Sequence, residues 1–158
     1  MALVRILIDG FSLLHQWTEL AAGKPRHSAA AREELISRLT QYYDATGTPL
    51  SIFFDGTTLP GRPDPALSTP EVEVIYSRAG QTADQLIERS AHRLRPYGEV
   101  LVVTDDRAER DTVESVGGLF ASCLAFIQTV ENSLADLERE IKNHNQQERR
   151  KFNRSAPA

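Results

Sequence analysis

The stretch VVTDDRAERDTV, residues 102–113, leads from an apolar run through two adjacent carboxylates, Asp105 and Asp106, into a strongly charged segment. This order is typical of a buried strand that ends where a helix begins, and Asp106 with Glu109 resembles the capping box found at helix starts. The same carboxylates could also form one corner of a metal site. The local sequence is compatible with both interpretations, so the rest of the chain has to decide between them.

Other apolar runs of strand length lie on both sides of this stretch. They are LVRILI (3–8), LSIFF (50–54), VEVIY (72–76) and VLVV (100–103), with a weaker GLFA (118–121). Most of these runs are continuously apolar rather than alternating, which is typical of strands that are covered on both faces in a parallel sheet.

Helical patterns lie between the apolar runs. Apolar residues recur at helical spacing over 31–42, 83–94 and 123–141, and the last pattern predicts a long C-terminal helix. Residues 56–70 hold four of the eight prolines and predict a long loop. Strands that alternate with helices predict an α/β fold, a three-layer α/β/α arrangement with a mainly parallel central sheet of about five strands.

Length and composition predict a single domain. The chain has 158 residues, of which 41% are hydrophobic, and this is enough for one core. We expect this domain to span residues 1–141 and residues 142–158 to form a basic tail, either a helical extension or a disordered end. The tail carries five Lys and Arg residues against one acid, although the whole chain has a net charge of −4. Such a tail is usually a solvated end and otherwise an anchor for a polyanion.

Cysteine usage, hydropathy and motifs exclude several function classes. A single cysteine, Cys123, rules out an internal disulfide framework and a cysteine-based zinc site. No apolar run reaches the roughly 20 residues of a membrane span, so no membrane partner is expected and the predicted location is cytoplasmic. No P-loop, G-x-G-x-x-G or G-x-S-x-G motif occurs, so neither dinucleotide binding nor a nucleophilic serine is supported.

Aspartates follow the predicted strands at the points where these strands end. Asp9 follows the first strand, Asp55 the second, and Asp105 with Asp106 the fourth, while Asp84 lies in the first turn of the helix after the third. In an open parallel sheet, ligands bind outside the carboxyl ends of the strands. We therefore expect these five acids on one edge of the sheet.

Each acid alone has an ordinary explanation in a turn or a helix cap, but the group is harder to explain in this way. Two carboxylates about 5 Å apart repel each other by roughly 3 kcal/mol at an effective dielectric constant near 20, so several together require a cation. Ligands that offer only oxygen suit Mg²⁺ or Mn²⁺. Because such a metal activates water and neutralises phosphate charge, the pattern indicates phosphodiester hydrolysis.

Four segments resemble a known family in the family's order and at its spacing. They are ILIDGFSLLHQW (6–17), FFDG (53–56), VEVIYSRAGQTADQLIE (72–88) and VVTDD (102–106). The chain resembles the YacP-like branch of the NYN domain, in the PIN-like nuclease superfamily, over about residues 3–140. The resemblance implies a PIN-like fold and a metal-dependent endoribonuclease. Because the YacP-like members resemble ribosome-associated nucleases that cut mRNA, it also implies mRNA as substrate and the ribosome as a partner.

The resemblance also implies roles for individual residues. The principal metal carboxylates, which are also the catalytic residues, would be Asp9, Asp84 and Asp105, with Asp55 and Asp106 as outer members. Ser12 stands where the family usually has Asn, and serine keeps a hydroxyl group but loses the reach of the amide. This departure keeps a second function open, a non-catalytic RNA- or ribosome-binding module on the same fold.

Further side chains near this edge are candidates for substrate binding. With Ser12, they are His15, which could face the site, and Arg62 and Arg78, which are candidate phosphate contacts. For His15 the alternative is a surface position, or one that contacts the site residues without touching substrate or metal. Trp17 is either a core aromatic or a platform for stacking RNA bases. A phosphoryl-accepting receiver domain also pairs a double acid with a strand-end aspartate, but here the double acid follows the fourth strand and no lysine ends a later one.

Overall fold

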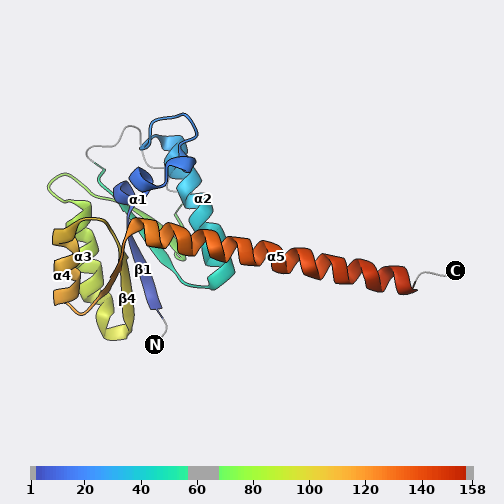
Figure 1. Cartoon of the computed structure of the whole chain (residues 1–158). Helices are drawn as coiled ribbons and strands as arrows, with labels where there is room; N and C mark the ends of the chain where they lie inside the picture. The colour runs from blue at the N-terminus through green and yellow to red at the C-terminus, as the bar shows by residue number, and fades with distance from the viewer. Residues whose placement is uncertain (1–2, 57–67, 156–158) are drawn as a thin grey trace.

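A sheet of five parallel strands forms the centre of the computed structural model, which describes residues 3–56 and 68–155. In chain order, the elements are β1 (Leu3–Asp9), α1 (Gly10–Gln16), η1 (Thr18–Leu20), α2 (Ala29–Thr46), β2 (Leu50–Phe54), β3 (Val72–Tyr76), α3 (Ala83–Leu94), η3 (Arg95–Tyr97), β4 (Glu99–Val103), α4 (Arg107–Ser115), β5 (Leu119–Ala121) and α5 (Cys123–Ser155). The strands lie in the order β3-β2-β1-β4-β5 (Figure 1). The predicted α/β fold with a parallel sheet of five strands is confirmed.

Helices cover both faces of this sheet. Ile6 and Ile8 of β1 pack in a core with α1, α2 and α5, whereas Leu7 between them packs in a second core with α3 and α4. Strand β2 is buried at every position. The central strands β1 and β2 are therefore covered on both faces, and the predicted three-layer arrangement is confirmed.

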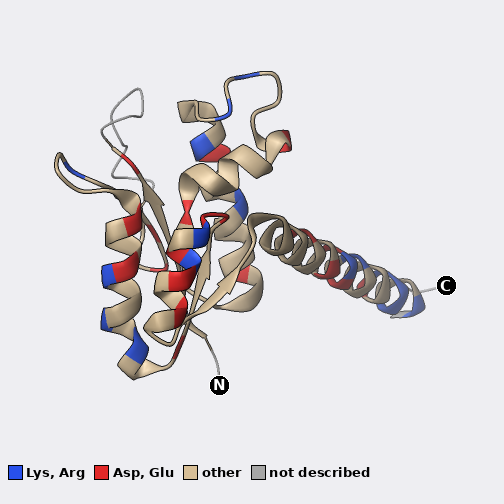
Figure 2. Cartoon of the chain, turned by 60° about the vertical axis from the view of Figure 1, so that its left-hand side comes forward, with Lys and Arg blue, Asp and Glu red and all other residues tan. Residues whose placement is uncertain are grey.

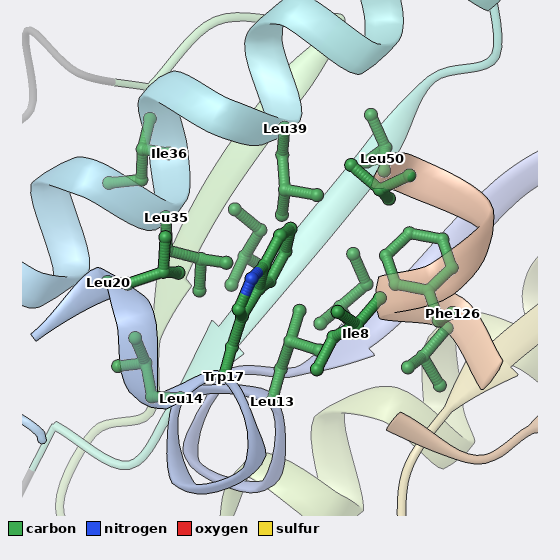
Figure 3. Packing of buried hydrophobic residues seen from close by; sticks show 14 of the residues in the cluster. Ile8, Leu13, Leu14, Trp17, Leu20, Leu35, Ile36, Leu39, Leu50 and Phe126 are labelled. Carbon is green, nitrogen blue, oxygen red and sulfur yellow. The ribbon is translucent and has the colours of Figure 1, made fainter. Parts of the chain in front are cut away.

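The first of these cores closes around Trp17, whose side chain is only 2% exposed. Figure 3 shows the indole ring among leucine side chains of α1 and α2, with Leu13 and Leu39 close to it. The guanidinium carbon of Arg38 lies 5.6 Å from the centre of the ring. Trp17 is thus a core aromatic, and its buried ring is not a platform for RNA bases.

The strand order places a topological switch point at the carboxyl edge of the sheet. From β1 the chain moves to β2 and β3 on one side, and from β3 it crosses back to β4 and β5 on the other. Because β1 and β4 are neighbours, with Ile8 beside Val103, the connections that follow them diverge. Ligands of doubly wound sheets bind at such a switch point. Asp9 and residues 104–106 follow these two strands.

Helix α5 extends far beyond the body. Its first part packs on α1 and α2 through the buried Cys123, Phe126 and Val130, whereas every residue of 138–154 is exposed. The helix projects away from the sheet (Figure 1), and Lys and Arg gather toward its far end (Figure 2). The segment for which the sequence left open a helical extension or disorder is thus helical as far as Ser155. The domain boundary at residue 141 stays a prediction.

None of the described helices combines the length and the apolar character that crossing a membrane requires. The predicted long loop, residues 56–70, falls between β2 and β3. Its residues 57–67, which include the candidate Arg62, lie outside the described part of the chain.

Candidate metal centre

Asp9 stands at the junction of β1 and α1, where it is the last strand residue and the N-cap of the helix. Its Oδ1 accepts a hydrogen bond from the Ser12 amide at 3.3 Å, and its Oδ2 accepts one from Ser12 Oγ at 2.9 Å. Asp9 is only 7% exposed. Burial raises the pKa of Asp9, the bonds from Ser12 partly offset this effect, and the charge of Asp84 adds to it. The two hydrogen bonds from Ser12 therefore fix the Asp9 carboxylate at the switch point of the sheet.

Two further acids reach the same point from the first turns of α3 and α4. Thr82 caps α3 in a reciprocal capping box with Gln85, and this start places Asp84 in the first turn. Glu109 lies in the first turn of α4 and is 2% exposed. One carboxylate oxygen from each of Asp9, Asp84 and Glu109 lies within 4.8 Å of the other two. We call these three residues the carboxylate cluster.

Glu109 has the most unfavourable environment for a charge in the cluster. Burial, and then the charges of Asp84 and Asp9, raise its pKa to about 9. Thr104 Oγ1 donates to Glu109 Oε2 at 2.9 Å, but the buried Oε1 receives no hydrogen bond from any described donor, and only a protonated Glu109 can bond to the Asp84 side chain. At neutral pH the cluster therefore either holds a proton or binds a cation. Three carboxylates, one of which has a buried oxygen that receives no hydrogen bond from a described donor, fit a hard divalent ion such as Mg²⁺ or Mn²⁺.

The position of Glu109 differs from its sequence interpretation as a capping partner of Asp106. Asp106 does cap α4, since its Oδ1 accepts from the amides of Ala108 at 2.9 Å and Glu109 at 3.4 Å. The Asp106 amide, however, donates to Thr104 Oγ1 at 3.1 Å, and the Glu109 carboxylate lies beside those of Asp9 and Asp84. A signal was present in the sequence: Glu109 lies four residues before the buried Val113, on the face of α4 that packs on the sheet.

The other strand-end aspartates lie outside the carboxylate cluster, and each is held by a neighbour. Asp105 Oδ1 accepts from the Cys123 amide at 3.0 Å and lies 3.5 Å from Arg110 Nη2. Asp55 Oδ1 accepts from Ser77 Oγ at 3.1 Å. The strand-end rule thus places these residues at the carboxyl edge but does not set the direction of each carboxylate. Metal roles for Asp55, Asp105 and Asp106 stay predictions.

The substrate-binding candidates divide between a pocket and the surface. Ser12 and His15 line a pocket of about 320 Å³ together with Phe11, Gln16, His27 and Asp105. His15 is exposed, and its Nδ1 lies 3.3 Å from Arg26 Nη1. Arg78 is exposed in the loop between β3 and α3, where its carbonyl oxygen accepts from the Gln81 amide. Because Ser12 also donates to Asp9, the pocket adjoins the carboxylate cluster.

Comparisons of this chain with known families, sequences and structures all identify YacP-like proteins as similar to it. The family described as the YacP-like NYN domain matches residues 6–156. A Bacillus subtilis (strain 168) relative, "Uncharacterized protein YacP", is 28% identical over 138 residues, which are 87% of this chain and 81% of the relative. The crystal structure of Rae1 (YacP) from Bacillus subtilis superposes with a TM-score of 0.76 at 25% identity, covering 94% of this chain and 84% of the other. A mutant form of that protein gives a TM-score of 0.73 at 26% identity, covering 90% and 84%.

Proposed function

This chain belongs to the YacP-like NYN domain family, and from that premise we propose that it is a Mg²⁺- or Mn²⁺-dependent endoribonuclease that hydrolyses RNA phosphodiester bonds. The observation that supports the proposal most directly is the carboxylate cluster at the switch point of the sheet. A site of this composition is otherwise unfavourable, because each pair of carboxylates within 4.8 Å repels by about 3 kcal/mol at an effective dielectric constant near 20.

Each residue near the cluster has a distinct part in this proposal. Asp9, Asp84 and Glu109 would hold the metal, which when bound supplies an activated water and neutralises charge on the scissile phosphate. Ser12 orients Asp9 by its two hydrogen bonds, so the serine can serve where the family usually has Asn. Thr104 orients Glu109 and lies 3.4 Å from Asp9 Oδ2. We retain Asp105 as a further metal-site residue in this proposal. It lines the adjoining pocket, and its Oδ1 accepts a hydrogen bond from the Cys123 amide.

We further propose that the RNA is mRNA on the ribosome, with a cytoplasmic location as the corollary. The far part of α5 supports an RNA partner, since Lys142, Arg149, Arg150, Lys151 and Arg154 are all exposed there. Among the described residues from 142 onward the one acid is Glu148, which lies 3.7 Å from Lys151. A basic helix end of this kind neutralises RNA phosphates and releases their counterions.

The decisive experiment compares Asp9→Asn and Asp84→Asn with Asp111→Asn, an exposed aspartate of α4. Purified proteins are incubated with mRNA, with and without ribosomes, in Mn²⁺ or in EDTA. Asp9→Asn and Asp84→Asn should lose at least about 100-fold in cleavage rate, a loss typical of removing a group that stabilises the transition-state charge, whereas the control should not. Cleavage that survives both changes, or that continues in EDTA, would contradict the proposal.

The second candidate is a non-catalytic RNA- or ribosome-binding module, favoured by Ser12 and by the basic part of α5. Calorimetric titration with Mn²⁺ separates the two functions. An enzyme of the proposed kind shows a saturable Mn²⁺ site that Asp84→Asn removes, while a binding module keeps its affinity for RNA or ribosomes and shows no such site.

A further inference from the structure

A pocket beside the carboxylate cluster is lined by both aromatic and polar side chains. It is lined by Phe11, Ser12, His15, Gln16, His27 and Asp105, and we call it the Phe11 pocket. Its volume is about 320 Å³, at the lower end of the range for small-ligand sites. Ser12 belongs to both the pocket and the cluster, because its hydroxyl donates to Asp9 Oδ2 at 2.9 Å. A group bound in the pocket would thus lie next to a phosphate held at the cluster.

Contacts within the protein hold the aromatic side chains of the pocket wall in place. The ring centres of Phe11 and His27 are 4.6 Å apart, with the rings tilted by 48°. Behind them, the buried Arg32 donates from Nη1 to the His27 carbonyl oxygen at 2.8 Å. His27 Nδ1 is buried and has no hydrogen-bond partner among the described residues. The two rings therefore form a preformed aromatic surface on the pocket wall.

The described residues that line the pocket include one carboxylate and no arginine or lysine, so the lining favours a neutral planar ligand over an anion. Asp105 contributes a carboxylate to the wall, which would repel a phosphate group at this point. Burial, and then the neighbouring side chains of His15, Arg26 and Arg32, lower the pKa of His27 below its ordinary value of 6.5, so its ring is mainly neutral near pH 7. The Gln16 amide offers both a donor and an acceptor, and neutral His27 can add one of the two at Nε2, since its Nδ1 is buried. A nucleobase matches this set, because it has a flat face for stacking and both kinds of group on its edge.

We infer that the Phe11 pocket binds one unstacked nucleobase of a single-stranded RNA, next to the phosphate at the carboxylate cluster. This inference rests on the proposed function, since it names a subsite for the same substrate. It places the base against Phe11 and His27, with Gln16 at its edge. Single-stranded RNA is commonly held in this way, by stacking bases on aromatic side chains.

The test measures binding without metal, so that it is read separately from cleavage. Nucleoside 5′-monophosphates of the four RNA bases, and ribose 5-phosphate, are titrated in EDTA into the full-length ¹⁵N-labelled protein. At least one nucleotide should shift the amide signals of Phe11, Gln16 and His27, and ribose 5-phosphate should not. Phe11→Ala should weaken the binding affinity for that nucleotide by about 5- to 150-fold, as expected for loss of one stacking partner. Tyr97→Ala, at a residue that is 78% exposed and outside the pocket, is the matched control.

Phe11→Tyr guards against a merely structural effect of Phe11→Ala, because it keeps a flat ring and should retain binding. Equal shifts of the amide signals with ribose 5-phosphate would show that the pocket binds anions rather than bases. No shifts with any nucleotide would show that the pocket binds none of them. Either outcome overturns the inference. Nucleotide binding together with absent cleavage would instead overturn the proposed enzyme and leave the subsite to an RNA-binding module.

Discussion

Replacing Glu109 by Gln tests the electrostatics of the carboxylate cluster directly. Glutamine keeps the shape of the side chain and can still accept the hydrogen bond from Thr104 Oγ1, but it cannot carry a charge. The wild-type protein must keep Glu109 protonated, or tolerate its charge beside Asp84 and Asp9. We therefore expect Glu109→Gln to be more stable than the wild type when no divalent metal is present.

The magnitude follows from the raised pKa. In the folded protein the pKa of Glu109 is about 9, against an ordinary value of 4.5, so at pH 7 folding must take up a proton that the unfolded chain has released. At about 1.4 kcal/mol per pH unit between pH 4.5 and pH 7, this costs about 3 kcal/mol. The variant avoids the cost, and its melting temperature should rise by about 6 to 12 °C.

The pH dependence has a fixed sign. Because the folded-state pKa is raised, the contribution of Glu109 to stability is most favourable below pH 4.5 and is lost as the pH rises toward 9. The gain from Glu109→Gln should consequently shrink to under about 1 kcal/mol at pH 5 and should increase from pH 5 to pH 8.

The assay is thermal unfolding in EDTA at several pH values, followed by the same series in Mn²⁺. Glu114→Gln, at an exposed position of the same helix, is the control and should melt like the wild type. In Mn²⁺ the wild type should gain more stability than Glu109→Gln, because the variant has lost one charged ligand. A variant that is no more stable than the wild type in EDTA at pH 7, or a gain that does not change with pH, would refute the reasoning.

Two further substitutions probe the junctions that hold the cluster. Asp106→Ala should lower the free energy of unfolding by about 1 kcal/mol, through loss of the N-cap of α4, while calorimetry still detects the Mn²⁺ site. If Asp106→Ala abolishes Mn²⁺ binding as Asp84→Asn does, Asp106 is a ligand and our geometric account is wrong. Gly10→Ala should destabilise the protein by about 1–3 kcal/mol, since an added Cβ would overlap the Phe54 ring and lie 2.9 Å from the Phe53 carbonyl oxygen. Unchanged melting of Gly10→Ala would show that this contact relaxes at no cost.

The sheet could be predicted from the sequence because its strands are short, mainly apolar runs, and the central strand β2 is buried at every position. Residues 50–54 and 72–76 are such runs, interrupted only by Ser51 and Glu73, and the observed β2 and β3 have those bounds. Helix α1 gave no comparable signal, since it has only seven residues and begins at Gly10. Its start depends on Asp9, whose side chain accepts from the Ser12 amide, and the sequence could not distinguish this capping contact from an ordinary turn.

The carboxylate cluster was predictable only in part. Asp9 and Asp84 could be placed at one edge because a strand end and a capping box fix the backbone at each. The orientation of Asp105 depends on its bond to the Cys123 amide, a contact between residues 18 positions apart that no local pattern shows. Glu109 was assigned to a cap because its spacing from Asp106 fits one, although its burial depends on how α4 packs against the sheet.

Helix α5 links two of these features over a long distance. The backbone amide of its first residue, Cys123, donates a hydrogen bond to Asp105 on the wall of the Phe11 pocket. Its last described turn carries Arg154. A continuous helix of 33 residues is about 50 Å long. An RNA held at the basic end would therefore meet the carboxylate cluster at a separation that the length of α5 sets. Under the proposed function, shortening the helix by whole turns should move the point of cleavage on the RNA rather than abolish cleavage.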